Sequence, residues 1–172
     1  NRGMPDDIPV LSKTAALRPV FSEDLRLPAS VVRKPGDVRS GLVGFRQVPG
    51  SRGDFLVVHQ SGRIWRLEKN AGGHTKSLYG DFVREVYAER GPNGLLGLAF
   101  HPRFRENRKY YLKHQVFEGG ELATVLVEKR AAPDLRTDSG EPSRRLLKIA
   151  SVTQNHSGGC IEFGPDGFLY FA

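Results

Sequence analysis

Short runs of apolar or alternating residues, separated by turns rich in glycine and proline, follow one another from residue 41 to the end of the sequence. Alternation with a period of two is typical of a half-buried strand, whereas an amphipathic helix repeats every three to four positions. Runs of the first kind lie at residues 41–48, 54–59, 63–67, 95–100, 109–116, 122–129 and 145–149. The sequence therefore predicts an all-β protein.

Turn residues join several of these runs into hairpins. Gln60-Ser61-Gly62 separates the second run from the third, and Glu118-Gly119-Gly120-Glu121 separates two later ones. Gly164-Pro165-Asp166-Gly167 lies between two short runs at the end of the sequence and predicts a last hairpin. Residues 76–79 predict a weaker strand or coil, and residues 81–89 fit either a short helix or an extended edge.

The predicted strands group into successive units of about four, which is the organisation of β-propeller blades. The sequence contains no exact internal repeat. Residues 1–34 hold prolines outside turns and mixed charges, and they predict an N-terminal extension. Residues 35–172 predict a partial propeller domain of about two blades. Because the sequence ends within a predicted strand, we expect it to be a piece of a longer chain.

Charge and composition exclude several classes of function. The net charge of +7 is spread over the whole sequence, and its densest groups, at 103–109 and 144–145, fall in predicted loops or strand edges. This distribution predicts a solvated surface and argues against a nucleic-acid site. No apolar run is long enough to cross a bilayer. The single cysteine, Cys160, excludes an intrachain disulfide and a cysteine-based zinc site, and beside Ile161 it is expected to be buried.

Histidines are the main candidates for chemistry. His156 stands among small residues at the start of a predicted strand, and an imidazole titrates near neutral pH. We expect His59 to pack within its hairpin and His101, before Pro102, to cap a strand end. Asp166 suits a turn residue that bonds its own backbone. No group of His, Asp or Glu has the spacing of metal ligands.

Two blocks of the sequence resemble one known family. The first runs from Gly91 to Phe104 and is followed by Tyr110-Tyr111, and the second runs from Asn155 to Tyr170. Their order and separation are similar to those of the soluble quinoprotein glucose/sorbosone dehydrogenases. The segment 58–67 looks like the first-blade hairpin of the same family. The resemblance implies a six-bladed β-propeller that uses pyrroloquinoline quinone (PQQ) with calcium.

The resemblance also implies roles for particular residues. His156 matches the family's general base, which takes the proton of the sugar hydroxyl while hydride passes to the quinone. Asn155 stands where the family often has an acidic residue, and Pro92 stands where glucose-oxidising members have Gln. Both positions line the sugar site in those enzymes, so the implied substrate is a sugar or related polyol rather than glucose in particular.

The remaining implications concern the whole protein. The resemblance implies a periplasmic or secreted oxidoreductase that passes electrons to a cytochrome or a soluble dye. Its residues for binding PQQ and calcium would lie after Ala172, so the chain by itself is expected to be inactive. Two alternatives remain open: a non-catalytic extracellular binding module of the same family, as in hedgehog-interacting-type proteins, and a structural segment of a larger surface protein. An acidic residue soon after the last strand, with basic residues in later blades, would favour the enzyme.

Overall fold

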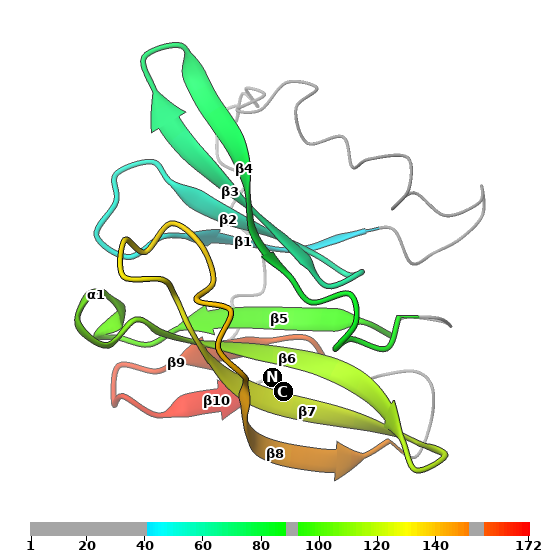
Figure 1. Ribbon diagram of the computed structural model, residues 1–172. Coiled ribbons are helices and arrows are strands. Elements are labelled where there is room, and N and C mark those ends of the chain that lie inside the picture. The colour runs from blue at the N-terminus through cyan, green and yellow to red at the C-terminus, as the bar shows by residue number, and fades with distance from the viewer. Residues whose placement is uncertain (1–40, 89–92, 152–156) are drawn as a thin grey trace, which may run out of the picture.

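The computed structural model describes residues 41–88, 93–151 and 157–172, which form two four-stranded antiparallel sheets and one two-stranded hairpin (Figure 1). The first sheet consists of β1 (Leu42–Gln47), β2 (Phe55–His59), β3 (Arg63–Asn70) and β4 (Gly73–Asp81). The second sheet consists of β5 (Leu95–Phe100), β6 (Lys109–Glu118), β7 (Glu121–Arg130) and β8 (Arg144–Ala150). The hairpin consists of β9 (Ile161–Phe163) and β10 (Leu169–Phe171).

Each sheet is a meander in which every strand pairs with its neighbours in the sequence. The first strands of successive units lie against one another, with β1 beside β5 and β5 beside β9. In a β-propeller the first strand of each blade lies nearest the central axis, so this arrangement is the one expected for adjacent blades. The strands predicted from the sequence pattern are confirmed.

Two apolar clusters lie on opposite faces of the second sheet. The larger one, called the inter-sheet core, fills the space between the two sheets, and its members include Val58, Ile64, Leu98, Leu112 and Val125. The smaller one, called the second core, joins the second sheet to the β9–β10 hairpin through Ala99, Tyr111, Leu126 and Ile161. Because successive side chains of a strand point to opposite faces, β6 places Tyr110 and Leu112 in the first cluster and Tyr111 in the second.

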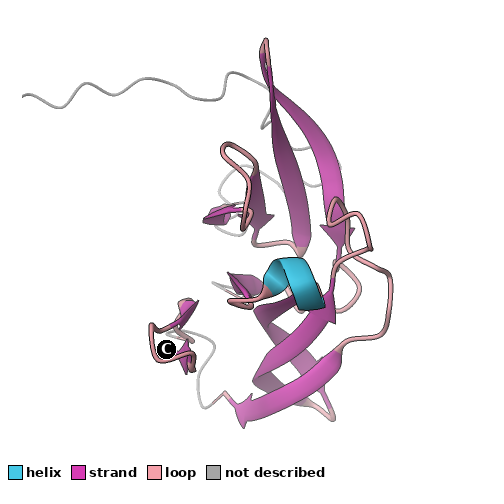
Figure 2. Cartoon of the chain, turned by 90° about the vertical axis from the view of Figure 1, so that its left-hand side faces the viewer, coloured by secondary structure: helices cyan, strands magenta, loops and turns pink. Residues whose placement is uncertain are grey.

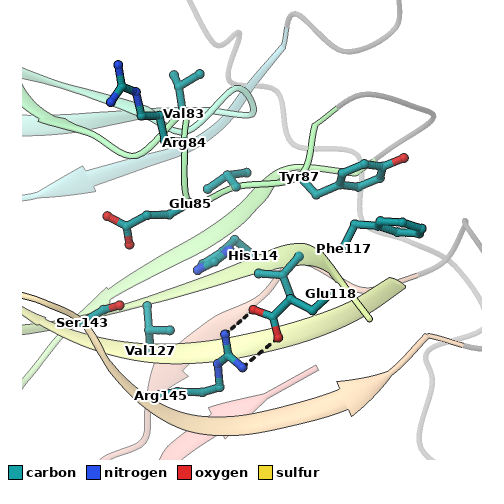
Figure 3. A pocket seen from close by; sticks show the side chains of 12 residues that line it. Val83, Arg84, Glu85, Tyr87, His114, Phe117, Glu118, Val127, Ser143 and Arg145 are labelled. Carbon is teal, nitrogen blue, oxygen red and sulfur yellow. Dashed lines mark hydrogen bonds and ion pairs between the residues drawn. The ribbon is translucent and has the colours of Figure 1, made fainter. Parts of the chain in front are cut away.

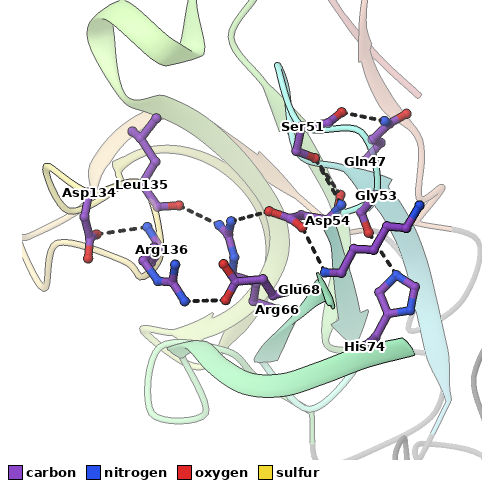
Figure 4. Close-up of polar contacts among 11 residues, drawn as sticks. Gln47, Ser51, Gly53, Asp54, Arg66, Glu68, His74, Asp134, Leu135 and Arg136 are labelled. Atoms are coloured by element: carbon purple, nitrogen blue, oxygen red, sulfur yellow. Dashed lines mark hydrogen bonds and ion pairs between the residues drawn. The ribbon is translucent and has the colours of Figure 1, made fainter. Parts of the chain in front are cut away.

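Polar contacts also tie the first sheet to the loop that follows β7 (Figure 4). The guanidinium of Arg66 donates to the Asp54 carboxylate at 2.6 Å and to the main-chain oxygen of Leu135 at 2.9 Å. Arg136, in the same loop, forms an ion pair with Glu68 of β3. Arg66 is 6% exposed, so its pairing with Asp54 compensates a buried charge that would otherwise be costly.

Three local features differ from the prediction or were left open by it. Gly73–Asp81 forms a full strand rather than weak structure, because the whole segment pairs with β3. The described residues between Asp81 and Ala88 form turns and coil, neither helix nor strand. The short helix α1 (Phe104–Asn107), cyan in Figure 2, was not predicted. It buries Phe104 against Phe100, with ring centroids 4.5 Å apart. Within the described ranges, no helix has the length and apolar character needed to cross a membrane.

Candidate functional site

The three residues predicted to form the site, Pro92, Asn155 and His156, all lie outside the described residues. What the structure places are the segments that adjoin them in the chain. Asn93 and Gly94 follow Pro92, and Ser157 follows His156. The geometry of these adjoining segments is the structural evidence about the candidate site.

The two sequence blocks of the predicted site lie side by side in the fold. The first block contains β5 and the second contains β9, and these two strands pack against each other. Their approach is so close at Gly97 that a Cβ atom there would lie 2.4 Å from the main-chain oxygen of Gly159. Only glycine fits at such a distance, which explains why the first block carries glycine at this position.

A second contact fixes the start of the first block against the first sheet. The main-chain oxygen of Gln60 accepts a hydrogen bond from the N–H of Leu95 at 2.8 Å, and the Gln60 amide donates to the oxygen of Asn93 at 3.0 Å. Gly94 between them has φ +140°, and a Cβ there would lie 2.3 Å from the Gln60 oxygen. The segment that follows Pro92 is therefore held on the turn between β2 and β3.

Two buried amides lie in this region. Asn93 and Gln115 are both completely buried. Both side-chain polar atoms of Asn93, and Oε1 of Gln115, have no hydrogen-bond partner in the part of the chain that the structure describes. A buried amide atom without a partner costs about 1–3 kcal/mol, and such atoms are often kept where a site needs them.

Gln115 bonds to three segments that are distant in the sequence. Its N–H donates to the main-chain oxygen of Gly94 at 3.0 Å, and its main-chain oxygen accepts from the N–H of Tyr87 at 2.8 Å. Its side-chain Nε2 donates to Oγ of Ser157 at 2.7 Å. One residue of β6 thus contacts both segments that flank residues 89–92 and the segment that follows His156.

Lys113 lies two positions before Gln115 on the same face of β6 and is also completely buried. Its ammonium group donates to the main-chain oxygen of Ala172 and lies 4.4 Å from the centroid of the Phe171 ring. Burial lowers the pKa of Lys113. Among the described residues, no side-chain carboxylate forms an ion pair with it. Sequence reasoning missed both residues, although three successive polar residues in an apolar strand were a visible signal.

The described histidines have structural contacts. His59 is buried at the end of β2, where its Nδ1 lies 2.7 Å from Oγ of Ser61, as the predicted hairpin role requires. Nδ1 of His101 accepts from the N–H of Arg103 at 2.9 Å, which confirms the predicted cap at the end of β5. Nε2 of His74 lies 2.9 Å from the main-chain oxygen of Gly53.

The last hairpin confirms one prediction and corrects another. Asp166 accepts from the N–H of Phe168 at 3.1 Å and from the hydroxyl of Tyr170 at 2.6 Å, so it is a turn residue that bonds its own backbone. Cys160 was predicted to be buried, and it is exposed. Side chains alternate along a strand, and here Ile161 takes the buried position.

A pocket of about 740 Å³ lies on the face of β6 opposite to Lys113 and Gln115 (Figure 3). It is bounded by residues 83–87 and by the ends of β6, β7 and β8. Tyr87 and Phe117 stack at one side with centroids 5.4 Å apart. At another side the Glu118 carboxylate accepts from Arg145 at 2.6 and 3.0 Å, and hydrogen bonds from Arg145 and Lys148 lower the pKa of Glu118 to about 2. The pocket and the Ser157 segment therefore lie on opposite sides of one strand.

The described residues do not suit a calcium site. They contain no group of three or more His, Cys, Asp or Glu side chains that could hold a metal ion. Near Ser157 the buried groups are an ammonium, which repels a cation, and amides, which suit a polar organic ligand. These residues therefore provide no set of calcium ligands.

Comparison with known proteins identifies the family. Residues 43–172 match the family model "Glucose / Sorbosone dehydrogenase", and the chain belongs to this family. It is 32% identical over 151 residues to the hedgehog-interacting protein of Homo sapiens, covering 72% of this chain and 21% of that protein. It is 30% identical over 122 residues to quinoprotein glucose dehydrogenase B of Acinetobacter calcoaceticus, covering 68% of this chain and 25% of that protein.

Solved structures agree with the fold. The soluble aldose sugar dehydrogenase from Escherichia coli in its apo form matches with a TM-score of 0.58 at 23% identity, over 73% of this chain and 35% of that one. The PQQ-bound aldose sugar dehydrogenase from Streptomyces coelicolor matches with a TM-score of 0.50 at 25% identity, over 80% of this chain and 40% of that one. The predicted fold class is confirmed: the described residues are mostly β, and their two four-stranded antiparallel sheets are propeller blades. The chain spans about a fifth of the length of the hedgehog-interacting protein and about a quarter of the length of quinoprotein glucose dehydrogenase B.

Proposed function

We propose that the full-length protein is a quinoprotein oxidoreductase that oxidises a sugar or a related polyol. The observation that carries this proposal is the packing of β5 against β9, which brings the two sequence blocks of the predicted site together in a member of the glucose/sorbosone dehydrogenase family. Within the proposal, residues 1–34 are an extension and residues 35–172 are part of the propeller domain.

In this proposal His156 is the general base. PQQ, when bound, supplies the acceptor for the hydride that leaves the CH–OH carbon of the substrate. The neutral imidazole of His156 takes the proton of the same hydroxyl group, so hydride and proton together account for both hydrogens lost from the substrate. Asn155 and Pro92 line the substrate site. The residues that hold PQQ and calcium lie elsewhere in the full-length protein, which is periplasmic or secreted and passes electrons to a cytochrome or a soluble dye.

A second candidate function is a non-catalytic extracellular binding module. The observation that favours it is the identity to the hedgehog-interacting protein, 32%, which is no lower than the 30% identity to quinoprotein glucose dehydrogenase B. A binding module of this kind needs the glycines at the contact between β5 and β9 but needs neither a base nor a quinone.

Quinone binding and turnover distinguish the two candidates. The full-length protein is mixed with PQQ and Ca²⁺, binding is followed by absorbance titration, and dye reduction is measured with a panel of aldoses and polyols. We expect stoichiometric binding and turnover, and a fall in kcat of about 100-fold or more for His156→Ala, as for the loss of a general base.

The matched control for this experiment is His74→Gln, because His74 belongs to β4 of the first sheet, where its Nε2 lies 2.9 Å from the main-chain oxygen of Gly53 and its ring lies 6.3 Å from that of Phe55. Its kcat should remain within about twofold of wild type, as for a substitution away from reacting groups. If the wild-type protein binds no PQQ, the enzyme proposal is wrong and the binding module takes its place.

A further inference from the structure

Gln115 occupies a position that neither packing nor sheet formation explains. It lies within β6, on the same face as Tyr111, whose side chain belongs to the second core. A leucine or methionine would fill a buried position on such a strand without the cost of burying an amide. The chain carries instead a completely buried glutamine.

The hydrogen bonds of Gln115 join the two segments of the candidate site. Its main chain bonds Tyr87 and Gly94, on either side of residues 89–92, at 2.8 and 3.0 Å. Its side-chain Nε2 bonds Oγ of Ser157 at 2.7 Å. The main-chain bonds would form with any residue except proline at position 115, whereas the bond to Ser157 requires a side chain that can reach across and donate.

A role in stability alone does not account for this amide. The hydrogen bond to Ser157 contributes about 1 kcal/mol, and a buried Oε1 without a partner costs as much or more. Oε1 of Gln115 has no partner in the described part of the chain. The net contribution of the amide to stability is therefore small, and its effect is to fix where the chain lies at Ser157.

We propose that Gln115 is a positioning residue for His156, acting through the hydrogen bond to Ser157; the inference rests on the proposed function of His156 as the base. Ser157 is covalently next to His156 in the sequence, so the hydrogen bond fixes the segment that directly follows the proposed base. Displacing a catalytic group by about 1 Å can lower the rate of a reaction about 100-fold without changing the affinity for substrate.

The test uses three variants of the full-length protein with PQQ and Ca²⁺. Gln115→Met removes the donor while keeping the length of the side chain, and Ser157→Ala removes the acceptor while leaving β6 intact. We expect each to lower kcat about 10- to 100-fold, with KM and the Kd for PQQ within about threefold of wild type. The kcat of the double variant should lie within about twofold of the kcat of the slower single variant, because both substitutions remove the same interaction.

The matched control is Tyr111→Phe. Tyr111 lies on the same strand and the same face as Gln115, and its hydroxyl bonds Glu128 at 3.1 Å, away from Ser157. Losing this buried hydrogen bond should lower the melting temperature and leave kcat unchanged. If Gln115→Met behaves like Tyr111→Phe, with lower stability and an unaltered kcat, the inference is wrong. Ser157→Ala decides the question alone if Gln115→Met does not fold.

A second readout separates this inference from the proposed function. The ring signals of His156 are recorded by NMR over a pH titration in wild type and in each variant, without cofactor or substrate. We expect Gln115→Met and Ser157→Ala to move these signals and Tyr111→Phe to leave them in place. If the wild-type protein binds no quinone, the proposed function fails, and the His156 signals still decide the positioning role: unmoved signals overturn it.

Discussion

The two four-stranded sheets have the same topology but differ in how their faces are covered. In the second sheet, β6 is buried without interruption from Tyr110 to Val116, because the first sheet covers one face and the β9–β10 hairpin covers the other. In the first sheet, β1 alternates between half-buried and exposed residues, and Phe45 is 46% exposed. This exposure belongs to the edge strand β1, because Val57 of the adjacent β2 is 1% exposed.

The comparison shows that a blade between two neighbours tolerates polar residues only when each has a partner or a function. In β1, at the edge of the first sheet, a polar side chain such as that of Gln47 is exposed to solvent. In β6 the side chains of Lys113 and Gln115 have no such route, and both contact the segment 157–172 instead. The buried polar residues of the second sheet are therefore the ones most closely linked to the candidate site.

The largest effect is expected where β5 of the second sheet packs against the segment that leads into β9. Gly97→Val places a side chain where a Cβ already lies 2.4 Å from the Gly159 oxygen, so β5 and β9 must separate. We expect a loss of about 3 kcal/mol in the free energy of unfolding, measured by urea titration, and faster hydrogen exchange in β5 and β9. Gly41→Val, just before β1, is the control, because a Cβ there has no atom within 4 Å. Equal losses for the two variants would contradict the comparison.

A smaller, pH-dependent effect is expected at Lys113. Burial lowers its pKa in the folded protein, so the unfolded chain binds more protons in the range between the two pKa values, and stability rises with pH there. Lys113→Met removes this penalty, and we expect it to raise the free energy of unfolding by about 1 kcal/mol at neutral pH. The advantage of methionine should shrink as the pH rises toward the usual lysine pKa.

Urea titrations at pH 7 and pH 10 measure this difference. The control is Lys69→Met in the first sheet, an exposed position where a change below about 0.5 kcal/mol is expected. An advantage for methionine at position 113 that grows with pH would have the wrong sign for a buried ammonium.

The smallest effect is expected at β1, the exposed edge strand of the first sheet. Phe45 is partly exposed and stacks on Phe55 with ring centroids 4.5 Å apart. Phe45→Ser should lower the free energy of unfolding by about 0.5–1 kcal/mol, close to the value of one aromatic pair. Leu112→Ala, on the covered sheet, should cost about 2–4 kcal/mol. A loss at Phe45 as large as that at Leu112 would show that β1 is covered in the protein.

Much of the fold could be predicted because its strands are set by local patterns. The hairpin of β2 and β3 follows from Gln60-Ser61-Gly62 between two alternating runs, and Gly62 adopts φ +104° in the turn. The short helix α1 could not be predicted in the same way. It depends on Phe104 finding a buried place against Phe100, which is a tertiary contact with no periodic signal in four residues.

The candidate site was predictable as two blocks of sequence but not as a set of contacts. The blocks were expected to act together, and the packing of β5 on β9 brings them together. The roles of Pro92, Asn155 and His156 remain predictions, because these residues lie outside the described ranges. Gln115 was missed because its partner Ser157 lies 42 positions away, and no local pattern reports a hydrogen bond over that separation.

The meander topology has a consequence for how the protein is made. Every strand in the two sheets pairs with one that is adjacent in the sequence, so each sheet can complete its own hydrogen bonds as soon as its four strands have left the ribosome. Such low contact order favours rapid folding, and units of this kind fold in order from the N-terminus. We expect the nascent chain to mature blade by blade, with the β1–β4 sheet serving as the surface on which the next blade condenses.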